Sequence, residues 1–176
     1  MKKLIKKKIG ILGGSFDPAH KGHIKISIEA KKKFKLNKVI WAVTKKNPFK
    51  SKTKLSLKER IKFAKKLNGK YNFIKVKFYE DIINSNKTIK LINYLKKNYK
   101  NTELFFIMGA DNLINFHKWD QWKKIAINCQ ILVFDRSGYK SKSMKSISFK
   151  KLKNKYLNFV KFKKVNISSS QLRKIW

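Results

Sequence analysis

The stretch Gly13-Gly14-Ser15-Phe16-Asp17-Pro18-Ala19-His20-Lys21-Gly22-His23 directly follows the short apolar run Ile9-Gly10-Ile11-Leu12. Such a run is typical of a buried strand, and the glycine pair ends it in a loop. From His20 onward the apolar residues take helical spacing. Glycine lets the backbone approach a ligand closely, and a helix N-terminus offers unpaired N–H groups and a partial positive charge. A strand, a glycine loop and a helix in this order predict a phosphate-binding site.

The rest of the chain alternates between expected strands and expected helices. Further strands are expected at 39–43, 73–76, 104–108, 131–134 and 160–165. Helices are expected at 56–67, which opens with a Ser-x-x-Glu capping box, at 88–99, in short pieces after residue 111, and at 168–174. Residues 140–155 have no clear pattern. This alternation predicts an α/β fold, a Rossmann-like doubly wound parallel sheet, in a single domain over residues 1–176.

Charge is the strongest compositional signal, with 46 Lys+Arg against 9 Asp+Glu and a formal net charge of +37. Three interpretations are open: nucleic-acid binding, capture of phosphorylated small molecules, and a bias of composition. The basic residues are almost all lysine and are spread evenly, whereas base recognition favours arginine. We therefore favour compositional bias with some help for anionic substrates, and we expect no nucleic-acid partner.

The sequence also indicates the compartment. The basic N-terminus is followed by an apolar run of only four residues, 9–12, which is too short for a signal core. No other stretch is long and uncharged enough to span a membrane, so no membrane partner is expected. A single cysteine, Cys129, excludes a disulfide within the chain and is typical of a reducing environment. We expect a cytoplasmic protein and leave open whether it forms a homo-oligomer.

His20 and His23 are the candidate catalytic residues of the glycine loop. Residues three apart at the start of a helix point the same way, so both imidazoles can donate hydrogen bonds to phosphate oxygens. The loop lacks the Gly-Lys-Ser/Thr ending of a Walker motif. Zinc binding is the alternative, but a third ligand at convincing spacing is missing, so no metal site is predicted.

A second candidate phosphate site lies near the C-terminus. Ser168, Ser169 and Ser170 come just before an expected helix, and Arg173 follows one turn later. Hydroxyls, free N–H groups and a guanidinium all suit a phosphate. The alternative is an ordinary serine cap with a surface arginine, which this stretch alone would favour.

Together the two segments resemble the signatures of the nucleotidyltransferase superfamily. The first matches its Gly-[Gly/Ser]-[Ser/Thr]-Phe-Asp-Pro-x-His-x-Gly-His pattern, and residues 167–173 match Ile-Ser-Ser-[Thr/Ser]-x-[Ile/Leu/Val]-Arg. The resemblance implies that His20 and His23 contact the ATP phosphates and stabilise the transferring group, and that the serines and Arg173 hold the β- and γ-phosphates. It implies that the rest of the ATP-binding loop is made by Gly13, Gly14, Ser15, Phe16 and Gly22.

The segment from Met108 to Trp119 resembles the nicotinate-mononucleotide adenylyltransferases in particular. The resemblance implies that Gly109 and Asp111 contact ribose hydroxyls and that Trp119 stacks on the pyridine ring. It also implies substrate-binding roles for Asn47, in the loop after the second strand, and for Thr88, which would meet the nicotinate carboxylate. Trp119 as core packing is the alternative, and Trp122 suits that packing role better.

The implied reaction is transfer of the adenylyl group of ATP to nicotinate mononucleotide, with Mg²⁺ carried by ATP. Lys87 and Asp120 stand where relatives have tyrosines, which bears on substrate selectivity. Two rival acceptors are nicotinamide mononucleotide and phosphopantetheine. A rival from another class is a basic nucleic-acid-binding protein with a degenerate loop, which would bind DNA or RNA in a salt-sensitive way and release no pyrophosphate.

Overall fold

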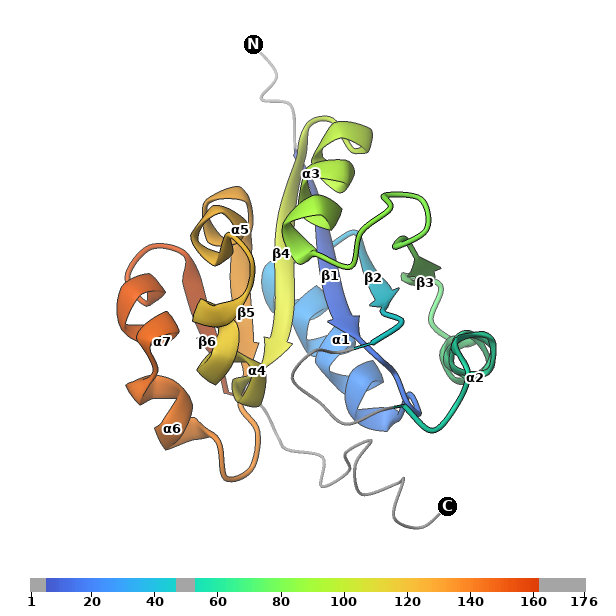
Figure 1. Cartoon of the computed structure of the whole chain (residues 1–176), viewed down its shortest axis with the longest axis horizontal. Helices are drawn as coiled ribbons and strands as arrows, with labels where there is room; N and C mark the ends of the chain where they lie inside the picture. Colours follow the sequence, from blue (N-terminus) through green and yellow to red (C-terminus); the bar gives the residue numbers. More distant parts are fainter. Residues whose placement is uncertain (1–5, 47–52, 162–176) are drawn as a thin grey trace.

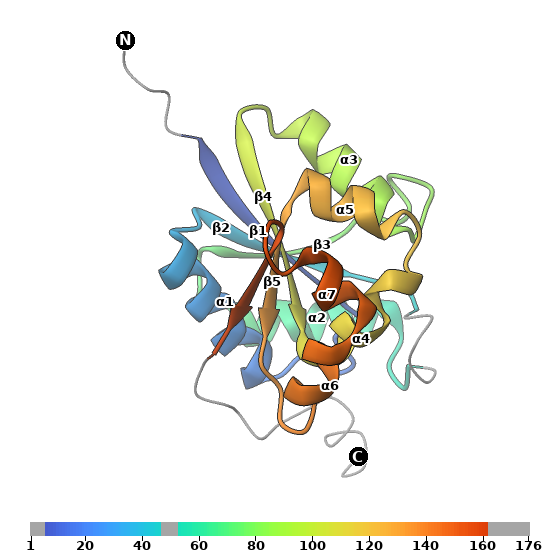
Figure 2. The ribbon, with the colours of Figure 1, turned by 90° about the vertical axis from the view of Figure 1, so that its left-hand side faces the viewer.

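A computed structural model describes residues 6–46 and 53–161, and they form a parallel sheet covered by helices on both faces (Figures 1 and 2). The strand order is β3-β2-β1-β4-β5-β6, and every neighbouring pair is parallel. The strands are β1 (Lys7–Gly14), β2 (Lys38–Val43), β3 (Ile74–Phe78), β4 (Thr102–Gly109), β5 (Gln130–Phe134) and β6 (Leu157–Val160). This arrangement confirms the predicted doubly wound α/β fold.

Helices cover the two faces in separate groups. One face carries α1 (Lys21–Phe34) and α2 (Leu57–Asn68). The other carries α3 (Thr88–Asn98), α4 (Ala110–Asn115), α5 (Trp122–Asn128) and α7 (Ile147–Leu152), with the short elements η1 (Phe116–Lys118) and α6 (Lys140–Lys145) nearby. Figure 1 shows the second group in front of the sheet and α1 behind it.

The strands divide their side chains between these two layers because successive residues point to opposite faces. In β1, Ile11 packs in the layer of α3 and Leu12 in that of α1; in β4, Phe106 and Phe105 divide in the same way. All four are at most 5% exposed, so β1 and β4 are buried on both faces, as expected for central strands of a parallel sheet.

Most element boundaries follow the sequence prediction, and one differs. The Ser56–Glu59 capping box opens α2 as expected, with the two side chains exchanging backbone hydrogen bonds. Residues 140–155, which had no clear pattern, contain α6 and α7. The last strand begins three residues earlier than predicted, because Leu157 and Val160 are the residues that pack against the core beside β5. The remainder of that predicted strand and the predicted helix at 168–174 lie outside the described residues.

The chain order places the candidate site at one edge of the sheet. Strands β1 and β4 are neighbours, and the order of the sheet reverses between them. In open parallel sheets, ligands bind at such a reversal, beyond the carboxyl ends of the strands. Here those ends are Gly14 and Gly109. Across the described parts of the chain, none of the helices has the length and apolar character needed to cross a bilayer.

Candidate active site

His20 and His23 form a reciprocal cap at the start of α1. The backbone N–H of Gly22 donates to His20 Nδ1 at 3.1 Å, and the backbone N–H of His20 donates to His23 Nδ1 at 3.1 Å. Their ring centroids lie 3.9 Å apart. The prediction that the two imidazoles lie together is therefore confirmed, and the backbone of the helix start fixes both rings.

These hydrogen bonds also determine which nitrogen of each ring carries the hydrogen. A nitrogen that accepts a hydrogen bond cannot itself be protonated, so Nδ1 is bare in both rings. Each neutral imidazole therefore carries its hydrogen on Nε2, the distal nitrogen. In the neutral form, each side chain can therefore donate a hydrogen bond only through Nε2.

Aromatic side chains of the core pack against the His23 ring. The ring of Phe16 lies 4.8 Å from that of His23 and stacks on Trp41 at 5.0 Å. Trp41 in turn donates its indole N–H to Ser27 Oγ at 2.8 Å, and Ser27 donates to the carbonyl of His23 at 2.8 Å. Phe16 is only 1% exposed, so its ring belongs to the core and holds His23 in place.

Arg60 fixes the loop on its other side, and sequence reasoning missed this. The guanidinium is 2% exposed and donates to four carbonyls: Nη1 to Ser15 at 2.6 Å and to Thr44 at 2.7 Å, Nη2 to Lys45 at 3.1 Å, and Nε to Leu55 at 3.2 Å. Burial lowers the pKa of Arg60. One signal could have pointed to this role, because Arg60 is one of only three arginines in a chain rich in lysine.

Asp17 of the same loop is buried and accepts two backbone hydrogen bonds, from Lys54 at 2.8 Å and Leu55 at 3.0 Å. The segment that precedes α2 is thus tied to the loop after β1. Arg60 and Asp17 together join the ends of β1 and β2 to the start of α2, which gives the loop a fixed shape before any ligand arrives.

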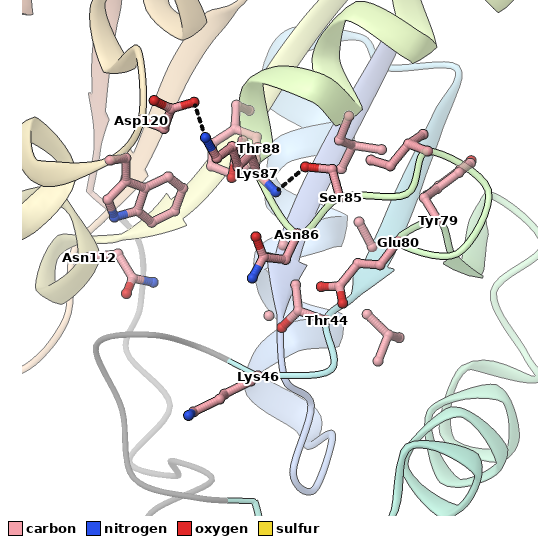
Figure 3. Close-up of a pocket in the computed structure, with 18 of the residues that line it drawn as sticks. Thr44, Lys46, Tyr79, Glu80, Ser85, Asn86, Lys87, Thr88, Asn112 and Asp120 are labelled. Carbon is pink, nitrogen blue, oxygen red and sulfur yellow. Dashed lines mark hydrogen bonds and ion pairs between the residues drawn. The ribbon is translucent and has the colours of Figure 1, made fainter.

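A cavity of about 370 Å³ extends from the glycine pair to the start of α3 (Figure 3). Gly13 and Gly14 are among the residues that line it, as are Thr88 and Trp119. A Cβ added to Gly13 or Gly14 would meet no protein atom closer than 3.4 Å. Packing within the protein therefore does not demand these two glycines, and their bare backbone widens the cavity instead.

Trp119 packs against the core and also lines the cavity, so core packing does not exclude contact with a ligand. Its ring meets Phe106 and Phe116 edge to face, at centroid distances of 5.9 and 5.2 Å, and it also lines the cavity. Trp122 packs on Phe116 at 6.0 Å and is absent from the cavity lining. Trp119 is thus a wall anchored in the core, and an aromatic ring in the cavity can contact it.

Asp111 is held by an arginine rather than pointing alone toward a ligand. Its Oδ2 accepts a hydrogen bond from Arg136 Nη1 at 2.5 Å, and the carboxylate is largely buried. Its Oδ1 lies over Gly109, where an added Cβ would come within 2.5 Å of it. A side chain at position 109 would therefore displace this carboxylate oxygen. The cavity is lined by the neighbouring Asn112 but not by Gly109 or Asp111.

Two carboxylates contribute negative charge to a cavity wall that also carries lysines. Burial raises the pKa of Glu80, whose two oxygens accept from the Lys45 backbone N–H at 3.2 and 3.3 Å. Asp120 Oδ2 pairs with Lys87 Nζ at 3.4 Å. Within residues 6–46 and 53–161, no group of three or more His, Cys, Asp or Glu side chains is arranged to hold a metal ion.

Five of the predicted site residues lie outside the described residues. They are Asn47, Ser168, Ser169, Ser170 and Arg173. Ser15 contributes its carbonyl to Arg60, and Gly22 contributes its amide to His20. Of the predicted residues, the structure thus brings Gly13, Gly14, Thr88 and Trp119 to one cavity and His20 and His23 to the adjoining helix start.

Comparison with known proteins agrees with this geometry. The cytidylyltransferase-like family model matches residues 11–175. A protein of Pelagibacter ubique named probable nicotinate-nucleotide adenylyltransferase is 65% identical over 97% of this chain and 94% of its own length. One of the same name from a Nitratiruptor species is 38% identical over 76% of each chain.

Among solved structures, the fold is similar to Plasmodium falciparum nicotinic acid mononucleotide adenylyltransferase complexed with NaAD. The TM-score is 0.78 at 21% identity, with 96% of this chain and 83% of that chain covered. At this identity the likeness concerns the fold alone. The sequence relatives and the family model carry the assignment further: this chain belongs to the nicotinate-nucleotide adenylyltransferases, within the cytidylyltransferase-like family.

Proposed function

We propose that this protein transfers the adenylyl group of ATP to nicotinate mononucleotide, giving deamido-NAD and pyrophosphate, in NAD biosynthesis. The observation that carries the proposal is one cavity lined both by Gly13 and Gly14, in the loop that leads to the capped histidine pair, and by Thr88 and Trp119. One end suits phosphates and the other suits a flat ring. The relatives that match most of the chain bear the name of this activity.

The chemistry needs positioning and charge stabilisation more than a strong base. The 5′-phosphate of the mononucleotide is already an anionic nucleophile, and it attacks the α-phosphorus of ATP in line with the departing pyrophosphate. Negative charge spreads over the phosphoryl oxygens as the reaction proceeds. The Nε2–H groups of His20 and His23 would donate to these oxygens, and rings fixed in advance need little rearrangement at that moment.

The ATP-binding roles of the loop follow from the same arrangement. Gly13, Gly14, Ser15 and Gly22 would offer backbone to the phosphates, with Phe16 supporting His23. Asp111, oriented by Arg136, would accept from ribose hydroxyls, with Gly109 leaving room for its carboxylate. Ser168, Ser169, Ser170 and Arg173 remain our candidates for the β- and γ-phosphates, and Asn47 for the substrate loop.

Mg²⁺ would arrive with the triphosphate rather than reside in a protein cage. The two carboxylates at the cavity, Glu80 and Asp120, each have a partner from the chain itself. Because Mg²⁺ keeps several waters and binds readily to substrate phosphates, it suits a site of this kind. We also infer a cytoplasmic location, which agrees with the single, buried thiol of Cys129, whose pKa burial raises to about 12.

Pyrophosphate release from ATP and Mg²⁺ tests the proposal, with nicotinate mononucleotide, nicotinamide mononucleotide or phosphopantetheine offered in turn. We expect rapid release with nicotinate mononucleotide and formation of deamido-NAD. No release with any acceptor would contradict the enzyme assignment, and preference for phosphopantetheine would contradict the substrate.

A further inference from the structure

An ion pair joins the two walls of the cavity at its pyridine end. Lys87 is the cap residue directly before α3, and Asp120 follows Trp119 on the opposite wall. Lys87 Nζ and Asp120 Oδ2 lie 3.4 Å apart, and both residues line the cavity (Figure 3). The contact therefore links the segments that carry Thr88 and Trp119, the two residues beside which the pyridine ring would lie.

This ion pair is suited to exchange its partner. The side chains of Lys87 and Asp120 are 54% and 39% exposed, and ion pairs exposed to this degree are weak. The Lys87 side chain makes no capping bond to α3, while its backbone N–H is held by Ser85 Oγ at 3.2 Å. Asp120 has a second contact, from Gln121 Nε2 at 3.5 Å. The Lys87 ammonium can thus move while its backbone stays fixed.

The charges around the cavity favour an anionic group on the ring. Lysines 46, 87 and 118 line it against Glu80 and Asp120. Glu80 is turned to the Lys45 backbone, and the N-terminus of α3 adds its partial positive charge beside Lys87. Nicotinate carries a carboxylate on its ring, whereas nicotinamide carries a neutral amide. Only the former can replace Asp120 as the counter-ion of Lys87.

We propose that Lys87 determines specificity for the nicotinate ring by leaving Asp120 to pair with the ring carboxylate. In the free protein, Asp120 pairs with the Lys87 ammonium and holds it at the cavity. When the substrate binds, Asp120 competes with the ring carboxylate for this ammonium. This inference rests on the proposed function and goes beyond it, because it assigns the choice between the two mononucleotides to a single side chain.

Two substitutions separate this role from a purely structural one. If the ion pair only held the two walls together, Lys87→Met and Asp120→Asn would both break it and would do the same harm. A specificity role predicts opposite effects, because Lys87→Met removes the partner of the carboxylate and Asp120→Asn removes its competitor. Lys124→Met is the matched control, since it removes an exposed positive charge outside the cavity.

The measurement is kcat/KM for pyrophosphate release with each mononucleotide. A lost charge-assisted hydrogen bond predicts that Lys87→Met lowers kcat/KM for nicotinate mononucleotide about 10-fold. The value for nicotinamide mononucleotide should change little. Asp120→Asn should keep or raise the value for nicotinate mononucleotide, and Lys124→Met should match the wild type. Equal losses for both substrates in Lys87→Met, or a matching loss in Asp120→Asn, would overturn the proposal.

Binding measured by quenching of tryptophan fluorescence keeps this test apart from that of the reaction. One outcome would support the role of Lys87 and contradict the proposed function. In it, the wild type binds nicotinate mononucleotide more tightly than nicotinamide mononucleotide, Lys87→Met binds both equally, and neither protein releases pyrophosphate. A chain that binds neither mononucleotide would overturn both.

Discussion

The helices α1 and α3 begin at the same edge of the sheet, yet their N-termini are built in opposite ways. At α1 both side chains of the cap, His20 and His23, bind backbone amides through Nδ1, and the aromatic core supports the second ring. At α3 the cap residue, Lys87, makes no side-chain capping bond and extends to an exposed carboxylate on the other wall. One helix start is internally satisfied, and the other is held by a weak external contact.

This difference matches the tasks proposed for the two ends. Groups that stabilise charge in a transition state work best when they are already in place, because rearrangement during the reaction has an energetic cost. A group that recognises a substrate before the reaction can instead exchange one partner for another. The α1 start therefore has the features of a catalytic element, and the α3 start has those of a selective one.

The largest effect should come from removing the His23 donor while keeping its cap. In His23→Asn the side-chain oxygen can still accept from the His20 N–H, but the distal N–H is lost. We expect kcat to fall about 10²–10³-fold, as when one oxyanion donor is removed, with little change in Tm. His23→Ala should lose a similar amount of activity and also about 0.5–2 kcal/mol of stability through the lost cap.

Ser56→Ala is the matched control, because it removes the corresponding cap from α2. It should show the loss in Tm without the loss in kcat. Near-normal turnover of His23→Asn would show that the ring acts only as a cap and would remove the contrast between the two helix starts.

The next effect concerns the support of the α1 loop. Arg60→Met leaves the carbonyls of Ser15, Thr44 and Lys45 without their buried donor, and unsatisfied buried groups are costly. We expect a loss of about 2–3 kcal/mol, since water can reach some of these carbonyls, and a fall in Tm of roughly 4–12 °C. Thermal unfolding followed by circular dichroism measures this directly. Arg60→Lys keeps the positive charge but not the planar guanidinium, so it should recover only part of the lost stability. An unchanged Tm in Arg60→Met would contradict the role of Arg60.

The sequence predicted those parts of the site that depend on local pattern. The apolar runs and the glycine pair located the ends of the central strands, and the three-residue spacing of His20 and His23 placed their rings together. The Ser56–Glu59 spacing located the start of α2. Each of these features depends on a few neighbouring residues, so strand and helix geometry is enough to derive it.

Contacts between distant segments could not be predicted in this way. Lys87 and Asp120 were noticed only as departures from a family pattern, because the sequence does not reveal that their segments face each other across a cavity. The partners of Arg60 are carbonyl groups, which every residue possesses and which therefore leave no signature. The start of β6 was predicted three residues too late for a related reason, since only pairing with β5 shows that the strand begins at Leu157.

A smaller effect should come from Trp119, which lines the same cavity as Lys87 and Thr88. Trp119→Ala removes a stacking surface worth about 0.5–1.5 kcal/mol, so KM for the mononucleotide should rise roughly 2- to 10-fold with little change in kcat. Trp119→Phe should recover most of the loss, and Trp122→Phe, outside the cavity, should leave KM unchanged. A KM that stays at the wild-type value in Trp119→Ala would leave Trp119 with packing alone.

The smallest effect is a pH dependence at the α3 end. Tyr79 lines the cavity, and burial, together with the nearby Tyr99 and Tyr94, raises its pKa from 10.0 to about 12. Because the folded protein holds this proton more tightly than the unfolded chain, the stability from Tyr79 is complete below pH 10 and is lost as pH rises toward 12.

At pH 10.5 this loss should amount to about 0.8 kcal/mol, relative to pH 8. The lysines also titrate in this range, so the useful quantity is the difference between the wild type and Tyr79→Phe in urea unfolding at the two pH values. The wild type should lose more stability than the variant. Equal losses would mean that the Tyr79 hydroxyl ionises as readily in the folded protein as in water, and that the α3 end is open to solvent well beyond the Lys87–Asp120 pair.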